Sequence, residues 1–477
     1  MIGSPIHPEA DVSHAPQPSA TRPVTALMLL SIRRSVRSRL LLALLILCAG
    51  MITFVPLAIQ GDGTPEGYLV VFVRYALGGS MALLSLAAVW VGCLAINAEF
   101  EQGSSELLFS KPPSRWSIWT GNLAGAAVVL TVVMILAAAC IYGLVRLRIF
   151  SVEAGPGERS LLRERLFVAR RIVLPRQEDY TIRARRLLQK LGRKRWIGAG
   201  MARDEALRVL QYALAVRGAS LAPGQTRTWI YDIGGGLPSE HAVLLKFRGL
   251  APAHGTAALF LNWTIREGVA GRTLLEKQIR CLPGREETVV IPTAAVAGVH
   301  LLSASCTNPR VNRVPVTFDP ATPPRLEIYA GRFEANYLRS VIILCANLVF
   351  LCSLGMLCGC IFSLPTAAFT SLWLLLMVNL APYFHTMAGK RFIFYSHHAV
   401  KTTPTVGDHF FRLFFSVLDR LFYPLRITDP LKVVAEVHAI PWGQVIYEVL
   451  FKAVVAVLVM SLAASLILGR RQYVKTP

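Results

Sequence analysis

The longest uncharged stretch of the chain runs from Val341 to Gly389 and constrains the fold more than any other feature. It holds about 49 residues without Lys, Arg, Asp or Glu, whereas one helix needs about 20 to cross the hydrocarbon core of a bilayer. Because Pro365 would interrupt a single helix, we expect two spans joined by a tight turn at Ser363 to Pro365. The stretch therefore predicts an integral membrane protein.

Further apolar runs have a length that suits a membrane-spanning helix. They are Leu40 to Gln60, Tyr75 to Ile96, Trp116 to Val145 and Val445 to Gly469. The last run contains Glu448 and Lys452, which lie one helical turn apart and are expected to pair on one face. Together with the hairpin, these runs predict six transmembrane helices, in agreement with a hydrophobic content of 54%.

Basic residues indicate how the predicted spans are oriented. Arg33, Arg34, Arg37 and Arg39 precede the first span, and the loop after it (GDGTPEG) carries only acidic charge. Because positive charge favours the cytoplasmic side, we expect both termini of this multi-pass protein in the cytoplasm, below the plasma (inner) membrane. The basic stretch 163–195 would then lie outside, which is acceptable because long loops cross the membrane largely regardless of charge.

The domain organisation follows from these spans. Residues 1–25 are predicted to form a disordered cytoplasmic tail, 26–145 the first three spans with a cytoplasmic helix at 97–117, 338–388 the fourth and fifth spans, and 444–477 the sixth span and a cytoplasmic tail. Outside the membrane we expect a basic helical segment at 146–219, a β-sandwich at 220–337, and a loop with an amphipathic helix at 389–443. The fold class is thus an α-helical polytopic membrane protein with an inserted extracytoplasmic domain that is part helical and mainly β-sandwich.

The β prediction rests on short alternating runs separated by turn signals. In one of them Leu259, Leu261, Trp263 and Ile265 fall on one face of a strand, with polar residues between them. Several such runs in succession are typical of a β-sandwich. Cys281 and Cys306 lie in this region, and the sequence leaves open whether they form a disulfide or remain two buried thiols.

The second external segment contains the run DHFFRLFFSVLDRLF, in which polar residues recur at helical spacing. This pattern predicts an amphipathic helix. The helix would either lie at the membrane interface or pack against the helical bundle, and the sequence does not separate these alternatives.

The connection between the second and third spans is unusually rich in charge. Its sequence, NAEFEQGSSELLFSKPPSRWSIW, predicts a short helix along the membrane surface that ends at Pro112 and Pro113. A plain structural interpretation is available, in which Glu99 and Glu106 cap helix ends while basic residues keep the segment in the cytoplasm.

The pattern E-x-E-x-G-[ST]-x-E-L-L-x-S-K-P-x-S-R-W in this connection resembles the cytoplasmic coupling segment of type-two ABC exporter permeases. The last span and its basic end are similar to those of the same family. The resemblance implies that a separate P-loop ATPase subunit contacts this segment, and that the permease works as a homodimer or with a sister subunit. The residues that the resemblance assigns to the ATPase contact are Glu99, Glu106, Leu107, Leu108, Lys111 and Arg115.

Catalytic motifs do not occur in the sequence. It contains no G-x-x-x-x-G-K-[ST], H-E-x-x-H or G-x-S-x-G pattern, so we expect no enzyme activity and no cofactor in this chain itself. The scattered histidines, including His385 and His438, are expected to be packed or interfacial residues and not metal ligands. The chain has a net charge of +22, and its basic residues flank apolar spans and lie in one large loop. The sequence has no recognisable nucleic-acid-binding motif, so membrane lipids are the expected partner.

Two functions from different classes fit these observations. The first is a permease subunit that exports a lipid-like or amphiphilic substrate, because the predicted spans carry almost no charge. The second is a membrane scaffold that transports nothing and presents an extracytoplasmic β-sandwich for binding.

Overall fold

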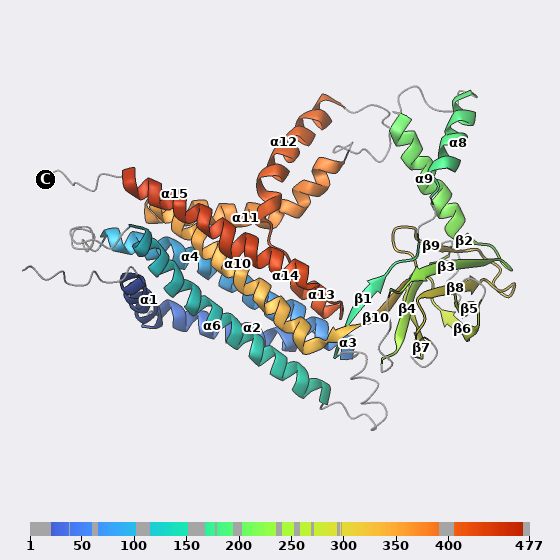
Figure 1. The fold of residues 1–477 in the computed structure, drawn as a ribbon, viewed down its shortest axis with the longest axis horizontal. Coiled ribbons are helices and arrows are strands. Elements are labelled where there is room, and N and C mark those ends of the chain that lie inside the picture. Colours follow the sequence, from blue (N-terminus) through green and yellow to red (C-terminus); the bar gives the residue numbers. More distant parts are fainter. Residues whose placement is uncertain are drawn as a thin grey trace, which may run out of the picture.

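The computed structural model describes residues 21–37, 39–59, 65–101, 115–150, 167–176, 179–193, 203–234, 241–251, 258–268, 271–292, 296, 298–390 and 405–470. These residues form a long helical bundle and a β domain attached to one end of it (Figure 1). Among the described residues, 6 helices are long and apolar enough to cross a membrane, the same number as the spans expected from the sequence. We call them the membrane-length helices.

The bundle is built from two groups of helices, one before and one after the β domain in the chain. Its elements are α1 (Thr21–Val36), α2 (Arg39–Ala58), α3 (Pro65–Leu69), the π-helix η1 (Val70–Leu77), α4 (Gly78–Glu101), α6 (Arg115–Phe150), α10 (Phe333–Ile361), α11 (Leu364–Gly389), α12 (Val406–Phe422), the 3-10 turn η3 (Tyr423–Leu425), α13 (Pro430–Ala435), α14 (Trp442–Glu448), the π-helix η4 (Val449–Ala456) and α15 (Val457–Arg470). Helices α10 and α11 form the hairpin predicted around Pro365, which stands at the start of α11.

Helix α10 lies at the centre of the bundle. It packs against α4, α6 and α15, and 78% of its apolar window is buried, more than in any other membrane-length helix. Glycines allow α4 and α10 to approach closely: a Cβ atom on Gly92 would overlap the Cys352 carbonyl oxygen, and one on Gly355 would overlap that of Val89. Small residues at such crossings let helix backbones touch in an apolar environment.

The β domain consists of two antiparallel sheets around a shared apolar core. Its strands are β1 (Val168–Val173), β2 (Ser220–Leu221), β3 (Thr226–Asp232), β4 (Val243–Leu250), β5 (Leu259–Glu267), β6 (Thr273–Cys281), β7 (Glu286–Ile291), β8 (Leu301–Thr307), β9 (Val316–Phe318) and β10 (Arg325–Arg332). One sheet has the order β1-β10-β4-β9-β2, with β7 also paired to β4, and the other has the order β3-β8-β5-β6. The inward alternation predicted for β5 is confirmed, since Leu261, Trp263 and Ile265 are all 0% exposed.

The structure corrects two local predictions. Residues 168–173 lie within the segment expected to be helical, but they form strand β1 because they pair with β10 along its whole length. Helices α8 (Thr181–Arg193) and α9 (Arg203–Ala219) then form a hairpin beside the sheets. Helix α1 begins at Thr21, inside the tail predicted to be disordered, and packs along α6.

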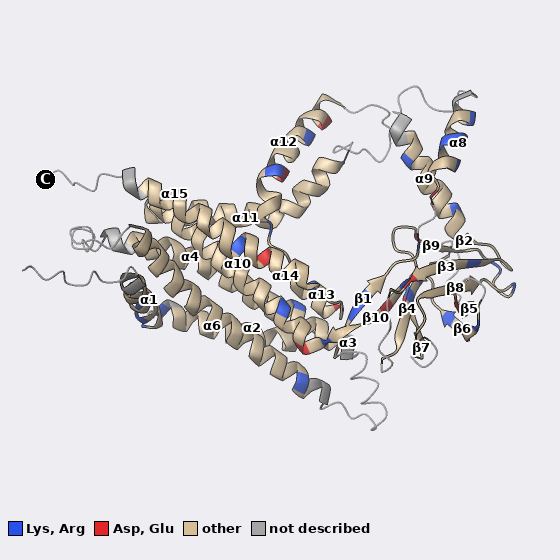
Figure 2. Cartoon of the chain, in the orientation of Figure 1, with Lys and Arg blue, Asp and Glu red and all other residues tan. Residues whose placement is uncertain are grey.

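Charged side chains are sparse along the middle of the bundle and frequent at its ends and on the β domain (Figure 2). The end of α4, the start of α6, helix α1 and the end of α15 lie at the end of the bundle far from the β domain (Figure 1). Arg33, Arg34 and Arg37 belong to that same end.

The close approach of α4 and α10 yields a stability prediction. Gly355→Val would force its new side chain against the Val89 backbone, and overpacking of this kind costs about 1–3 kcal/mol. We expect a thermal unfolding midpoint several degrees lower for the detergent-purified protein, measured by intrinsic fluorescence. Gly143→Val on α6 is the matched control, since no atom lies within 4 Å of its added Cβ. Equal midpoints for the two variants would contradict the close crossing.

Candidate functional site

At the β10–α10 connection, the β domain is joined to the bundle without an intervening residue. Strand β10 ends at Arg332 and helix α10 begins at the next residue, Phe333. The Phe333 backbone N–H also donates to the carbonyl of Phe167, just before β1, at 3.3 Å. Because the strand continues directly into the central helix, a displacement of one would move the other, and the residues around this point form a candidate functional site.

A loop between α13 and α14, residues 436–441, binds the edge of the β domain. We call it the junction loop. The Arg170 N–H of β1 donates to the Val437 carbonyl at 2.8 Å, and the Ala439 N–H donates to the Arg170 carbonyl at 2.8 Å. These two bonds make a short parallel bridge between β1 and the loop. The loop thereby protects the edge of the six-stranded sheet, as edge strands require.

Helix α10 binds the same loop from the other side. The Asn336 amide donates to the His438 carbonyl at 2.7 Å and accepts from the Ile440 N–H at 2.7 Å. The Arg339 guanidinium donates to the Ile440 carbonyl at 2.9 Å and stacks over the Trp442 ring at 4.7 Å. The junction loop is thus held between the first strand of the β domain and the first turns of the central helix.

The junction loop contains an unfavourable backbone conformation. Val437 has φ of 62°, and among the described residues it is the one non-glycine with positive φ. A β-branched residue rarely adopts this conformation, which costs on the order of 1–3 kcal/mol and persists only where surrounding contacts impose it. Here the bonds to Arg170 and Asn336 supply that constraint.

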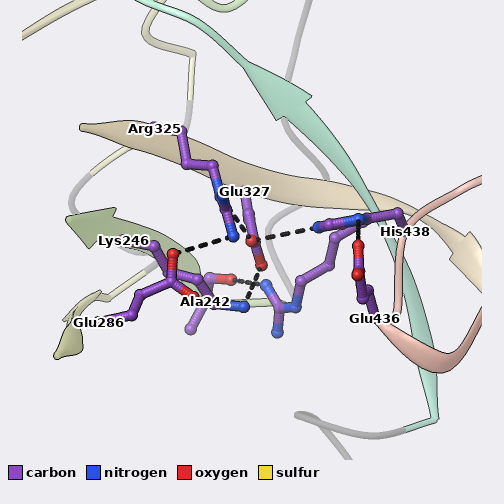
Figure 3. A network of polar contacts seen from close by, with 8 residues as sticks. Ala242, Lys246, Glu286, Arg325, Glu327, Glu436 and His438 are labelled. Atoms are coloured by element: carbon purple, nitrogen blue, oxygen red, sulfur yellow. Dashed lines mark hydrogen bonds and ion pairs between the residues drawn. The ribbon is translucent and has the colours of Figure 1, made fainter. Parts of the chain in front are cut away.

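A carboxylate at the centre of the junction gathers positive groups from three elements (Figure 3). Glu327 on β10 is 0% exposed. Its oxygens lie 3.0 Å from Lys246 Nζ, 3.4 Å from Arg325 Nε and 3.3 Å from His438 Nε2. The other ring nitrogen of His438 lies 3.4 Å from Glu436 Oε2, so the ring lies between two carboxylates. His438 therefore links the sheet to the junction loop through polar contacts.

The environment of Glu327 favours its ionised form. Burial alone would raise the pKa of this carboxyl, but the hydrogen bond with His438 and the charge of Lys246 outweigh burial and lower the pKa from 4.5 to about 2. A folded-state pKa below the unfolded value means that the ionised group stabilises the fold above pH 4.5, and that this stability disappears as the pH falls toward 2. The shift corresponds to stabilisation on the order of 3 kcal/mol.

A second buried polar group lies deeper, within the membrane-length helices. Lys452 Nζ lies 2.7 Å from Glu448 Oε2 one turn earlier, which confirms the pairing expected from their spacing. The same ammonium donates to Asn347 Oδ1 of α10 at 2.7 Å and to Thr428 Oγ1 at 3.3 Å. Lys452 is 2% exposed and lies in the π-helix η4, a distortion that often occurs at functional sites. Buried ionisable groups in such helices are functional candidates by default.

Residues assigned to the ATPase contact are only partly within the described chain. Glu99 belongs to the last turn of α4 and Arg115 is the first residue of α6. Glu106, Leu107, Leu108 and Lys111 lie outside the described residues. The contact therefore stays a prediction, and the predicted helix at 97–117 is described only as the ends of α4 and α6.

Cys281 and Cys306 are free, buried thiols in the structure. Cys281 lies on β6 and Cys306 on β8, and strand β5 runs between them. Two strand spacings amount to about 9–10 Å, beyond the roughly 7 Å over which two Cα atoms can be bridged. The disulfide left open by the sequence would require this sheet to rearrange. Burial raises the pKa of both thiols, that of Cys281 to about 11.

The remaining histidines that the structure describes show no common site. His385 contacts Asp419 at 3.2 Å and stacks on Tyr423, far along the chain from His438. His397 and His398 lie outside the described residues. Within the described parts of the chain, no group of three or more His, Cys, Asp or Glu side chains is arranged to hold a metal ion.

Comparisons with protein families, with curated proteins and with solved structures find no match for this chain. The geometry of the junction and the sequence resemblance of the α4–α6 connection are therefore the basis for a functional proposal.

The pKa of Glu327 yields a pH-dependent prediction. Glu327→Gln removes a charge that stabilises the fold above pH 4.5, so its unfolding midpoint should lie below that of the wild type at pH 6, and the gap should narrow at pH 3 and below. Thermal unfolding of the purified full-length protein across this pH range measures the gap. Glu276→Gln, an exposed carboxylate on β6, is the control and should behave as the wild type. A gap that is independent of pH would contradict the assigned ionisation.

The inner ion pair yields a prediction about single and double variants. Lys452→Met leaves Glu448 buried without its partner, which costs about 3–5 kcal/mol. The double variant Glu448→Gln/Lys452→Met removes both charges and should recover much of the lost stability. Unfolding midpoints in detergent, combined as a double-mutant cycle, measure the coupling. Additive losses would show that the two charges do not stabilise each other.

Proposed function

We propose that this chain is the membrane-spanning permease subunit of an ABC exporter, and that a separate P-loop ATPase docks under the connection between α4 and α6. The observation that carries the proposal is the charged pattern of residues 99–116 in that connection, which resembles the coupling segment of type-two ABC exporters. The number of membrane-length helices and the position of this connection after the second of them agree with the same family.

The arrangement of the chain ends supports this proposal. The ends of α4 and α6 flank the connection and lie at the same end of the bundle as α1 and the end of α15 (Figure 1). The arginines of α1 belong to that end, and positive charge favours the cytoplasmic side. In the proposed orientation the ATPase is cytoplasmic, both termini of the chain are cytoplasmic, and the β domain lies outside the membrane.

The junction supplies a physical route from the ATPase to the β domain. Helix α4, which leads into the connection, packs tightly on α10, and α10 continues into β10. Asn336 and Asn347 on α10 also bind the junction loop and the ion pair of the last membrane-length helix. A displacement of α4 driven by ATP hydrolysis would therefore move α10, the last membrane-length helix and the β domain together.

The character of the helices favours an amphiphilic or lipid-like substrate. Apolar side chains dominate the exposed faces of α2, α4 and α11, including Leu47, Leu86 and Leu372 around one surface groove. A path for a small hydrated ion needs polar or charged lining. A groove of this character is better suited to an acyl chain or another apolar body.

Helix α12 also suits a protein that handles amphiphiles. Phe415 and Phe422 face α11, while Phe410, Leu413, Phe414, Val417 and Leu421 remain exposed on a neighbouring face. The helix packs on α11, which is one alternative left open by the sequence, and its exposed apolar stripe is compatible with the other, a position at the membrane interface. An apolar stripe beside polar residues suits the boundary between headgroups and acyl chains.

The proposal predicts the effect of reversing one charge in the connection. Glu106→Lys should reduce the amount of co-purifying P-loop ATPase about 10-fold or more, since charges of both signs would fix how the two subunits dock. Affinity purification in mild detergent, with identification of co-purifying proteins and an ATPase assay, measures this. Glu276→Lys reverses an exposed carboxylate on β6 of the β domain and serves as the matched control.

The outcomes separate the exporter from the scaffold. An ATPase that accompanies the wild type and the control, but not Glu106→Lys, supports the exporter. Absence of any ATPase from all three folded proteins would refute it, and would favour a scaffold whose function resides in the β domain.

A further inference from the structure

A pocket of about 480 Å³ lies between the α8–α9 hairpin and the sheets of the β domain. Tyr180, Arg208 and Tyr212 contribute from the hairpin side, and Arg227, Trp229 and Phe318 contribute from the sheets. Its volume falls in the range of sites that hold small molecules. None of the residues named in the junction lines this pocket, and neither the exporter nor the scaffold gives the pocket a role.

The acidic groups of the pocket already have local partners. Asp179 Oδ1 accepts from the Thr181 N–H at 2.8 Å, and the bonds from Thr181 hold the pKa of this carboxyl below its usual value. Asp319 accepts from the Ala321 N–H at 2.9 Å and from the Thr322 hydroxyl at 3.2 Å. Both carboxylates thus complete turns of their own chain segments.

The basic groups of the pocket are less fully engaged. Arg176 and Arg208 line it, and within the described chain neither guanidinium has an ion pair or hydrogen-bond partner. Arg227 lies over the Trp229 ring at 5.5 Å and within 3.5 Å of the Tyr180 hydroxyl, so it also contributes positive charge. Guanidinium groups present forked donors that match carboxylate and phosphate oxygens. The pocket therefore offers donors for an anion.

One wall of the pocket is aromatic and proline-rich. Trp229 and Phe318 form an edge-to-face pair at 5.1 Å at the base of the pocket. Pro320, Pro323 and Pro324 border them. Such an aromatic and proline surface is suited to a hydrocarbon or ring body.

The walls of the pocket are held in place before any ligand binds. Tyr180 and Arg227 pack closely on Gly218: a Cβ atom at this position would lie 2.5 Å from the Tyr180 hydroxyl and 3.0 Å from Arg227 Nη1. Gln211 of α9 donates to Thr181 of α8 at 2.9 Å and ties the two helices together. A preformed site loses less conformational entropy on binding.

We infer that this pocket binds an anionic amphiphile, in which a phosphate or carboxylate group is joined to an apolar body. The anionic group lies against Arg176 and Arg208, and the apolar body lies on Trp229 and the prolines. The inference does not depend on an ATPase partner, because a scaffold with the same β domain would bind the same ligand.

The test uses the full-length protein in nanodiscs of neutral lipid, with binding followed by thermophoresis. The probes are hexyl phosphate, inorganic phosphate and the neutral hexyl glucoside. We expect saturable binding of hexyl phosphate, and binding at least 10-fold weaker for each of the other two. Inorganic phosphate that binds as tightly as hexyl phosphate would overturn the role of the apolar wall, and equal binding of hexyl glucoside would overturn the role of the arginines.

Variants locate the site. Arg176→Gln/Arg208→Gln should weaken hexyl phosphate binding at least 10-fold, whereas the control Arg248→Gln/Arg280→Gln, two exposed arginines elsewhere on the sheets, should leave it unchanged. Ala215→Trp on α9 should fill the pocket and abolish binding without lowering the unfolding midpoint. Unaltered binding in both pocket variants would overturn the assignment.

A competition experiment separates two sources of this chemistry. Nanodiscs that contain an anionic phospholipid should compete with hexyl phosphate if the natural ligand is a membrane lipid. If they do not compete while hexyl phosphate still binds, the ligand is a soluble amphiphile. Both results support a site for an anionic amphiphile. If hexyl phosphate does not bind the wild-type protein in neutral nanodiscs, that site is refuted.

Discussion

The amide side chains of α10 are the interactions on which the rest of the structure depends. Asn336 and Asn347 are eleven residues apart, so they lie on nearly the same face of the helix. One binds the junction loop and the other binds Lys452 of the last membrane-length helix. In an apolar surrounding, an amide that loses its partner costs about 1–3 kcal/mol, so these bonds fix both the rotation and the height of α10 relative to its neighbours.

Polar contacts of this kind add specificity more than stability. Most of the favourable energy comes from apolar packing around α10, and an apolar pair of the same shape in place of Glu448 and Lys452 would be about as stable. An apolar pair could slide, however, whereas an ion pair bound to Asn347 has one register. The strained Val437 also favours specificity over stability. The chain retains an unfavourable backbone conformation there, and this conformation keeps the loop between β1 and α10.

Sequence patterns predicted the elements whose signals are local. The membrane-length helices and the alternating strands were found because each repeats a simple period over many residues, and the Glu448–Lys452 pair was found because its partners are one turn apart. Strand β1 was missed because its sequence VARRIV is basic and forms a strand only through pairing with β10. The junction was missed because Asn336 and Glu327 meet His438 across more than 100 residues of chain, and no local period encodes that meeting. His438 was noted from the sequence, but nothing near it in the chain indicated its partners.

Strand β10 connects the pocket, the junction and the bundle. Pro323 and Pro324 border the pocket, and the buried Tyr231 hydroxyl holds the Pro324 carbonyl at 2.8 Å. The next residues, Arg325 and Glu327, belong to the junction network, and the strand then enters α10. Eight residues of strand span about 27 Å, so a single extended segment runs from the pocket, through the junction network, to the start of α10. A ligand can shift the equilibrium between two positions of the helices only if it binds one position more tightly than the other. Pro323 and Pro324, just before β10, are where this difference in affinity would arise. They border the pocket that we propose for the ligand, and they would move with the strand.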